Sequence, residues 1–410
     1  MDNASRAGGR KKSSPRLIIF RLLTLSIGTL LGLGVAEAGL RLMEKIRLRD
    51  RTVITVPDDR LGNRVAPNSP GHDANGFRND AIRARVDIVA LGDSQTWGVN
   101  VQSIDSWPRQ LERISGASVY NMGVGGYGPI QYLVLTDKAL EFSPKTIVVG
   151  LYFGNDIYDS YALAYGNDAY AELRSPTMSN ELRADTIKPK SEAYWDEEKA
   201  FHNTFGRSSP AGWSFWLREH LAIGRLLNGF GLWPGATDVD YEIDKTWAQN
   251  YPDHGAVCED AAVRTVFTTA YRLTALNMDD PRIAEGLRIT KETLRRAQQK
   301  AASRGVRLLV LLIPTKELVY ADLMQQENRV RGAYQKLVEM ENRARTEVLS
   351  FCAQENGLCI DALPQLRSAI ARREQIYPST TESHPNANGY RVMAEEVGRA
   401  IKEAAARKPL

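Results

Sequence analysis

Short apolar strand candidates alternate with longer helix candidates from residue 86 onward, and this alternation constrains the fold more than any other feature. The strand candidates are rich in Val, Ile and Leu and mostly lack polar positions, which is typical of parallel strands covered on both faces. They lie at residues 87–91, 118–121, 146–153, 307–313 and 358–361. Helix candidates lie at residues 106–114, 129–142, 281–304, 329–356 and 388–408. Repeated strand–helix units predict an α/β fold with a doubly wound parallel sheet.

Two segments depart from this alternation. Residues 44–80 are rich in turn residues and have no clear period, so we expect a linker or wrapping segment before a domain at 81–410. An insertion at about 160–280 follows the third strand and contains five of the seven tryptophans, Trp195, Trp213, Trp216, Trp233 and Trp247. Loops after parallel strands line the ligand crevice, so this insertion could form a lid or a wall that stacks on sugar rings. A small core within the insertion would explain the tryptophans equally well.

The N-terminal region combines a basic tail, residues 1–16, with an apolar run at 17–43. A membrane-spanning helix needs roughly 17–25 mostly apolar residues, and this run supplies them. The sequence Ala36-Glu37-Ala38 also fits a signal-peptide cleavage site. We favour an uncleaved, single-pass anchor because the apolar run is long for a signal peptide. In either case the basic flank stays in the cytoplasm, which places the rest of the chain outside the inner membrane and predicts no nucleic-acid partner.

Cysteine and histidine are too few for several classes of protein. The chain has three cysteines and five histidines, which excludes a disulfide scaffold or a zinc ribbon and shows no spacing for a metal site. An oxidising compartment would permit a Cys352–Cys359 disulfide. Two small buried thiols would explain these cysteines equally well.

Polar residues follow the predicted strands. The first strand runs into "ALGDSQTWG" with Ser94, the third into "FGNDIYD" with Asn155, and "TESHPNANGY" places His384 just before the last helix. Ser94 could be only the polar cap of the next helix, because Ser and Asp favour such corners. The carboxyl ends of parallel strands face one crevice, however, so we expect these three residues to meet there.

The second strand ends in a glycine turn, "YNMGVGGYGP", which allows another interpretation. Gly123, Gly125 and Gly128 have the G-x-G-x-x-G spacing of a dinucleotide-binding loop. That motif normally follows the first strand, and Asp156 lies about 28 residues beyond it rather than the usual ~20. We therefore expect no nucleotide cofactor.

These motifs together resemble the SGNH, or GDSL-like, hydrolase superfamily. The matching blocks are "GDS" at 92–94, "NMGVGG" at 121–126, "GND" at 154–156 and "HPNANGY" at 384–390. The resemblance implies a three-layer, flavodoxin-like fold and acyl-ester chemistry without a cofactor. It implies that Ser94 is the nucleophile and His384 the base. The Ser94 and Gly126 backbone N–H groups and the Asn155 amide would then form the oxyanion hole.

The chain departs from the family in the acid that orients the histidine. The usual D-x-x-H pattern would place Asp at position 381, where this sequence has Thr381. We assign the role to Glu382, two residues before His384, because Thr381 carries no charge. If Glu382 were only a solvated loop residue, the histidine would be oriented by backbone alone.

The resemblance leaves three functions open. The first is a membrane-anchored serine esterase that acts on acyl esters in the cell envelope. The segment "LLIPTKELVY" at 311–320 and the E-x-H pattern are similar to SGNH-like proteins of alginate O-acetylation. The second function is therefore an exopolysaccharide O-acetyltransferase, and the third is a silent glycan-binding or assembly component. Lys316 in this segment could equally be an ordinary charged loop residue.

Overall fold

The computed structural model describes residues 15–49, 53–178, 221–229, 236–260, 262–355 and 357–406. These residues belong to two compact units, one made of 1–50 with 209–236 and the other of 51–208 with 237–410. Most of the expected basic tail at 1–16 lies outside the described residues, as do Trp195, Trp213, Trp216 and Trp233.

The larger unit is built on a parallel sheet of five strands in the order β4-β3-β5-β8-β9. The strands are β3 (Ile88–Gly92), β4 (Val119–Gly123), β5 (Thr146–Tyr152), β8 (Arg307–Ile313) and β9 (Leu358–Asp361). Each begins and ends within two residues of its predicted position. The doubly wound α/β fold predicted from the sequence is confirmed, and its strand order is the flavodoxin-like one.

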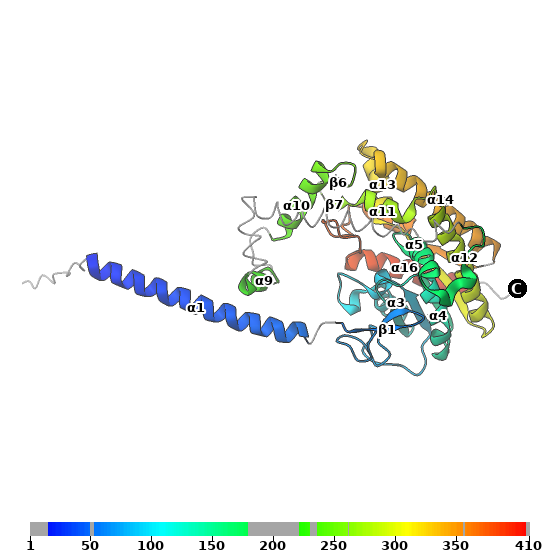
Figure 1. Ribbon diagram of the computed structural model, residues 1–410, viewed down its shortest axis with the longest axis horizontal. Coiled ribbons are helices and arrows are strands. Elements are labelled where there is room, and N and C mark those ends of the chain that lie inside the picture. Colours follow the sequence, from blue (N-terminus) through cyan, green and yellow to red (C-terminus); the bar gives the residue numbers. More distant parts are fainter. Residues whose placement is uncertain are drawn as a thin grey trace, which may run out of the picture. The chain divides into compact units, whose positions relative to one another are not determined.

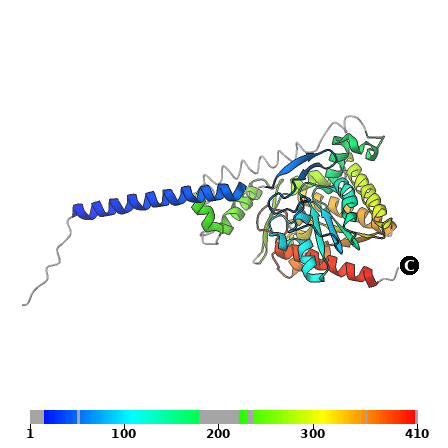
Figure 2. The ribbon, with the colours of Figure 1, turned by 90° about the horizontal axis from the view of Figure 1, so that it is seen from below.

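Helices cover both faces of this sheet, which makes three layers. One face packs against α4 (Pro129–Glu141), α12 (Pro281–Ala302) and α14 (Gly332–Gln354). The other packs against α3 (Trp107–Ser115), α13 (Lys316–Gln326), α15 (Leu363–Ala371) and α16 (Ala387–Ala406). Figure 2 shows the red helix α16 and the yellow helix α12 on opposite sides of the strands.

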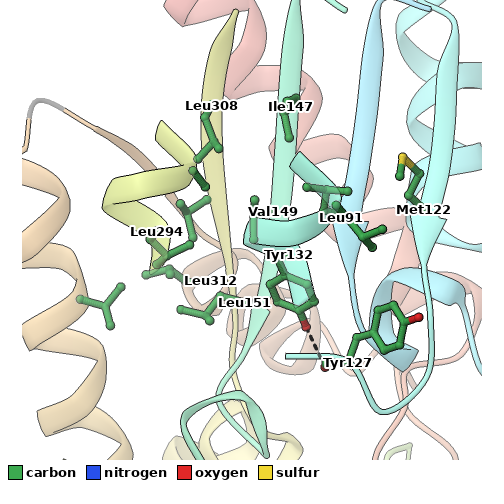
Figure 3. Packing of buried hydrophobic residues seen from close by; sticks show 14 of the residues in the cluster. Leu91, Met122, Tyr127, Tyr132, Ile147, Val149, Leu151, Leu294, Leu308 and Leu312 are labelled. Atoms are coloured by element: carbon green, nitrogen blue, oxygen red, sulfur yellow. Dashed lines mark hydrogen bonds between the residues drawn. The ribbon is translucent and has the colours of Figure 1, made fainter. Parts of the chain in front are cut away.

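Successive residues of a central strand point to opposite apolar clusters. In β3, Val89 and Leu91 belong to the first cluster, and Ile88 and Ala90 to the second. Figure 3 shows part of the first cluster, in which Leu91 lies near Tyr132 of α4 and Val149 of β5. Burial on both faces is the physical reason why these strands read as continuous apolar runs.

A row of three glycines makes room for the short helix α2 (Ser94–Trp97), which begins just beyond β3. Gly92 pairs with Gly123 on one side and with Gly150 on the other. A Cβ atom at Gly123 would lie 2.4 Å from the backbone nitrogen of Trp97, and one at Gly150 would lie 2.6 Å from the Thr96 hydroxyl oxygen. The glycine that began the apparent dinucleotide motif therefore serves close packing of α2 on the sheet.

The expected linker or wrapping segment carries an antiparallel hairpin, β1 (Thr55–Asp58) with β2 (Gly62–Val65). Val65 and Phe77 from this segment are buried in the first apolar cluster. The carboxylate of the buried Asp73 accepts hydrogen bonds from the Tyr120 hydroxyl at 2.5 Å and from the Asn79 amide at 3.2 Å. The segment is thus packed onto the sheet unit.

The insertion after β5 carries further elements. They are α5 (Asp156–Gly166), the 3-10 helix η2 (Asp168–Leu173), α10 (Ala236–Asn250), the hairpin β6 (Ala256–Glu259) with β7 (Arg264–Phe267), and α11 (Thr269–Leu276). Trp247 is buried in a small cluster with Tyr241, Ala248 and Val266. For this one tryptophan, the interpretation as part of a local core is confirmed.

The smaller unit contains α1 (Pro15–Arg49), drawn as one long helix in Figure 1, and α9 (Ala222–Gly229). Within α1, Ile19–Met43 is long and apolar enough to cross a membrane. The Glu37 carboxylate accepts hydrogen bonds from the backbone nitrogens of Ala222 at 2.9 Å and Ile223 at 3.1 Å. It also pairs with Arg41 at 2.6 Å. One carboxylate of α1 therefore caps the first turn of α9.

A disulfide bond joins Cys352 near the end of α14 to Cys359 in β9. Cys258 is a free, buried thiol. Of the two interpretations of Cys352 and Cys359, the structure has the bonded pair.

Candidate active site

Asp93, rather than Ser94, caps the helix that follows β3. The Asp93 carboxylate accepts a hydrogen bond from the Gln95 backbone nitrogen at 2.8 Å, and Ser94 is the first helical residue. The Ser94 hydroxyl is thereby left to make contacts outside the helix, of which the contact to Asp93 at 3.3 Å is the weaker. Its other contact leads to His384.

Ser94, His384 and Glu382 form a continuous relay. Ser94 Oγ lies 2.8 Å from His384 Nε2, across 290 positions of the chain. His384 Nδ1 lies 2.5 Å from Glu382 Oε1, which also accepts the His384 backbone N–H at 3.0 Å. If Nε2 accepts the hydroxyl proton, Nδ1 carries the ring hydrogen and donates it to Glu382.

Thr381 makes no such contact to the imidazole. Its backbone nitrogen donates to Asp244 of α10 at 2.6 Å. The structure thus places the carboxylate of Glu382, and not the side chain at position 381, beside His384.

The environment separates the protonation states of the two carboxyl groups nearest Ser94. Burial alone would raise the pKa of Glu382, but hydrogen bonds and the charge of His384 outweigh it and lower that pKa to about 2. Ionised Glu382 therefore stabilises the folded state fully at pH values above 4.5, its ordinary pKa. This stabilisation is lost as the pH falls toward 2. Burial raises the pKa of Asp93 to about 6, although the Gln95 N–H opposes the shift.

A cavity of about 460 Å³ opens over the relay. It is lined by the predicted site residues Ser94, Gly126, Asn155, Glu382 and His384, together with Tyr152, Thr268, Tyr271, Arg272, Thr380, Thr381 and Ser383. The structure thus brings all five predicted site residues to one cavity at the carboxyl edge of the sheet.

Two of the three predicted oxyanion donors are free to bind a ligand. Within the described part of the chain, the Ser94 and Gly126 backbone N–H groups have no hydrogen-bond partner. Gly126 has a φ of +79°, a left-handed conformation that suits glycine. The Asn155 amide instead donates to Asp159 at 2.6 Å and to Asp156 at 3.3 Å, so an oxyanion would have to replace the longer of these two hydrogen bonds.

The dinucleotide-binding interpretation requires an acidic side chain that can bind a ribose, and Asp156 is not available for this. Asp156 is fully buried, and its carboxylate accepts the Tyr152 backbone N–H at 3.0 Å and the Tyr132 hydroxyl at 3.1 Å. Burial and the charge of Asp93 raise the pKa of Asp156 well above its ordinary value. A side chain held in this way cannot reach a ribose. In the described ranges, no group of three or more His, Cys, Asp or Glu side chains is arranged to hold a metal ion.

The segment before the sheet secures the turn after Ser94. The Arg78 guanidinium donates to the carbonyls of Trp97 at 3.0 Å, Gly98 at 2.6 Å and Val101 at 2.9 Å. It also lies 3.8 Å from the centroid of the Trp97 ring. His72 Nε2 accepts the indole N–H of Trp97 at 3.0 Å, so its Nδ1–H donates to the Pro70 carbonyl at 2.9 Å. Sequence reasoning missed this support because Arg78 and His72 lie in a turn-rich stretch without a motif.

Two buried cations lie beside the loop that carries Glu382 and His384. Lys316 begins α13 and is fully buried, so it is not a solvated loop residue. Arg272 of α11 is 8% exposed and lines the cavity. The sequence offered a weak signal for Lys316, through the "LLIPTKELVY" segment, and none for Arg272.

Comparison with known proteins finds a family model that is similar to the C-terminal part of the chain. The family model described as "SGNH hydrolase-like domain, acetyltransferase AlgX" matches residues 267–409. This range includes Lys316, Glu382 and His384, and it covers all of α13 and α16. Ser94, Gly126 and Asn155 lie before it. No curated protein matches the chain.

Solved structures of GDSL-type proteins are similar over most of the chain. A putative lipolytic G-D-S-L protein from Desulfitobacterium hafniense is 13% identical, with 78% of this chain and 99% of that chain covered and a TM-score of 0.35. A GDSL-like lipase from Bacteroides thetaiotaomicron is 10% identical, covering 79% and 93%, with a TM-score of 0.31. A catalytic mutant of an acetylxylan esterase from Geobacillus stearothermophilus is 9% identical, covering 78% and 95%, with a TM-score of 0.34.

Proposed function

We propose that this chain, an SGNH hydrolase-like enzyme of the class that acts on ester bonds or transfers acyl groups, works through an acyl-enzyme at Ser94. The observation that carries the proposal is the relay from Ser94 through His384 to Glu382, which ends in an open cavity. A nucleophile, its base and the group that orients the base are the parts that such chemistry needs.

The proposed reaction uses one atom for each step. Ser94 Oγ attacks the acyl carbonyl while its proton passes to His384 Nε2, and Glu382 stabilises the imidazolium. The Ser94 and Gly126 N–H groups and the Asn155 amide stabilise the oxyanion. The C–O bond to the leaving alcohol then breaks, and that alcohol takes the proton from Nε2. An acceptor hydroxyl then gives its proton to Nε2 and attacks the acyl carbonyl. The bond from the acyl carbon to Ser94 Oγ breaks, and Nε2 returns the proton to Ser94 Oγ.

The acceptor distinguishes two functions that share this acyl-enzyme. With water as acceptor the protein is a serine esterase of the cell envelope. With a sugar hydroxyl it is a polysaccharide O-acetyltransferase, and the family match favours this candidate because its description names an acetyltransferase. The insertion supports a glycan acceptor as well, because Thr268, Tyr271 and Arg272 from it line the cavity.

We further propose that α1 is a retained membrane anchor and that the larger unit lies outside the cytoplasm. Cleavage after Ala38 would remove Glu37, whose carboxylate caps α9. Retention of the helix keeps this contact. The Cys352–Cys359 disulfide supports an oxidising compartment for the larger unit.

The proposed chemistry is tested by covalent labelling of the full-length chain in detergent. We expect a fluorophosphonate to label the wild type once, at Ser94, and to leave Ser94→Ala unlabelled. Incubation with an acetyl ester should give an acetyl-Ser94 species in the intact mass, and added O-deacetylated polysaccharide should discharge it. Mass gain on the sugar identifies the transferase, and discharge by water alone identifies the esterase. Absence of both labelling and acyl-enzyme would leave only a glycan-binding role.

A further inference from the structure

Lys316 binds two separate parts of the chain that meet behind the active-site loop, defined here as residues 380–384. Its ammonium donates to the carbonyls of Thr380 at 2.9 Å and Glu382 at 3.0 Å in this loop. It also contacts the Val266 carbonyl at 2.7 Å and the Thr265 hydroxyl at 3.0 Å in β7. Four oxygens thus surround one ammonium group, which fixes the loop against the hairpin of the insertion.

The position of Lys316 is itself held from the other side. Thr315, the N-cap of α13, donates its backbone N–H to the buried Glu341 of α14 at 2.8 Å, and its hydroxyl contacts the same carboxylate. Glu317 accepts the Thr268 backbone N–H at 3.2 Å. The lysine therefore projects from a helix start that is bonded to two other elements, and it cannot follow a moving loop without breaking these contacts.

Arg272 holds the same loop from a second direction. Its guanidinium donates to the Ser383 hydroxyl at 2.5 Å and makes a longer contact of 3.4 Å to the Gly154 carbonyl. Ser383 precedes His384, and Gly154 precedes Asn155. One arginine thus joins the loop of the base to the loop of the oxyanion donor.

Both cations are buried, and for Lys316 this burial has an energetic cost that ordinary packing would not require. Lys316 is fully buried. Arg272 has no direct ion pair with a described carboxylate, and the nearby charges of Glu317 and Glu382 offset its burial and raise its pKa. A buried charge without a salt bridge is costly, and a hydrophobic residue of similar volume would often be as stable. Burial lowers the pKa of Lys316 to about 8, while Glu317 and Glu382 oppose the shift. Two buried cations that both bind the five-residue active-site loop indicate a functional role for them.

We propose that Lys316 and Arg272 are positioning residues that together hold the active-site loop, so that His384 stays aligned with Ser94 while the acyl group enters and leaves. The inference rests on the proposed function, because it gives the two cations a role in the same reaction. It adds two residues, both outside the four blocks that resemble the superfamily, and it accounts for the "PTK" part of the 311–320 segment.

The test compares Lys316→Met and Arg272→Met with Lys291→Met and Arg295→Met as matched controls. Lys291 and Arg295 pair with glutamates on the surface between α12 and α14, outside the active-site cavity. We expect the first two variants to lower kcat and the rate of fluorophosphonate labelling on the order of 10–100-fold. KM and the final labelling stoichiometry should stay within about twofold, because the site remains folded but misaligned. The controls should match the wild type.

Two outcomes separate the failure of this inference from the failure of the proposed function. A wild type that gives neither fluorophosphonate labelling nor an acetyl-Ser94 species overturns the proposed function, and the inference falls with it. A labelled wild type with unchanged rates in Lys316→Met and Arg272→Met overturns the inference alone.

A third variant covers the case in which a methionine variant does not fold. Ser383→Ala removes the hydrogen-bond acceptor of Arg272 and leaves both cations in place. We expect Ser383→Ala to reproduce the kcat loss of Arg272→Met. The double variant of Arg272→Met with Ser383→Ala should lose little more kcat than either single variant, because both substitutions break the same contact. Losses that simply multiply in the double variant would contradict the proposed link. Rescue of Arg272→Ala by added guanidinium, with urea as a neutral control, provides a further readout.

Discussion

At the scale of single residues, the site depends on which neighbour satisfies which polar group. Asp93 caps α2, so the hydroxyl of Ser94 is left for His384. The strand ends and the start of the last helix predicted that Ser94, Asn155 and His384 meet, and the resemblance to the SGNH superfamily added Gly126 and Glu382. Arg272 and Arg78 could not be predicted in this way. Their contacts are to backbone carbonyls and a hydroxyl distant in sequence, and no motif marks such partners.

Asn155 is the oxyanion donor that a substitution can test. We expect Asn155→Ala to lower kcat by roughly 10²–10³-fold with little change in KM, because the lost hydrogen bond forms mainly in the transition state. Steady-state kinetics on a small acetyl ester provides the measurement. Asn167→Ala is the control, because the Asn167 side chain bonds Asp59 and Ala169 outside the cavity. An unchanged kcat in Asn155→Ala would remove this residue from the oxyanion hole.

Glu382 and Thr381 can be compared directly as orienting groups. We expect Glu382→Gln to lower kcat by more than tenfold, because an amide can neither take a charge nor stabilise the imidazolium. Thr381→Ala should keep most activity, since the bond from Thr381 to Asp244 uses the backbone nitrogen. The same kinetic assay, together with the rate of fluorophosphonate labelling, ranks the two variants. A larger loss in Thr381→Ala would reassign the orienting role.

At the scale of elements, the strands were the most predictable part, because burial on both faces makes them short apolar runs with clear ends. The helix α13 was not predicted. Its residues 316–321 are all buried. The exposed polar side chains, Asp322, Gln325 and Gln326, are confined to its last turns and give no helical period along the whole helix. The hairpin β1–β2 was also missed, since its short, mostly exposed strands lie among turn residues.

Glu341, which joins α14 to the start of α13, makes the free energy of unfolding depend on pH. Burial raises the pKa of Glu341 to about 8, although its hydrogen bonds from Thr315 oppose this. The folded chain therefore keeps a proton that the unfolded chain loses near its ordinary value of 4.5, so stability falls as the pH rises from 4.5 to 8. We expect Glu341→Gln to weaken this fall, with a gain on the order of a few kcal/mol at pH 8.

Thermal unfolding of the full-length chain in detergent across this pH range measures the effect. Glu347→Gln is the control, because Glu347 lies on the same helix and its side chain is 40% exposed. Parallel stability profiles for the wild type and Glu341→Gln would contradict the assignment.

At the scale of the whole molecule, the sequence indicated an apolar N-terminal helix but left open whether it is retained. The contact from Glu37 to α9 joins residues that are 185 positions apart, and no local pattern predicts it. The composition of the helix is compatible with either an anchor or a signal peptide. The choice between them therefore needs an observation on the mature protein.

We expect the mature chain to keep its N-terminus. Intact mass of protein purified from membranes should include residues 1–38, and the protein should resist carbonate extraction, since the helix spans the bilayer. A mature chain that begins at Gly39 would overturn the anchor while leaving the active site untouched. Glu37→Gln serves as a probe of the contact to α9, because a neutral amide caps the helix less well than a carboxylate.

The three hydrogen bonds of Arg78 to the turn after Ser94 set a practical limit on truncation. A soluble version that starts where the sheet begins, near residue 86, discards this arginine and would release the nucleophile turn. Its inactivity could then be mistaken for evidence of a non-enzymatic protein. Expression for crystallisation or screening should therefore start near residue 53, which removes α1 and keeps the hydrogen bonds of Arg78.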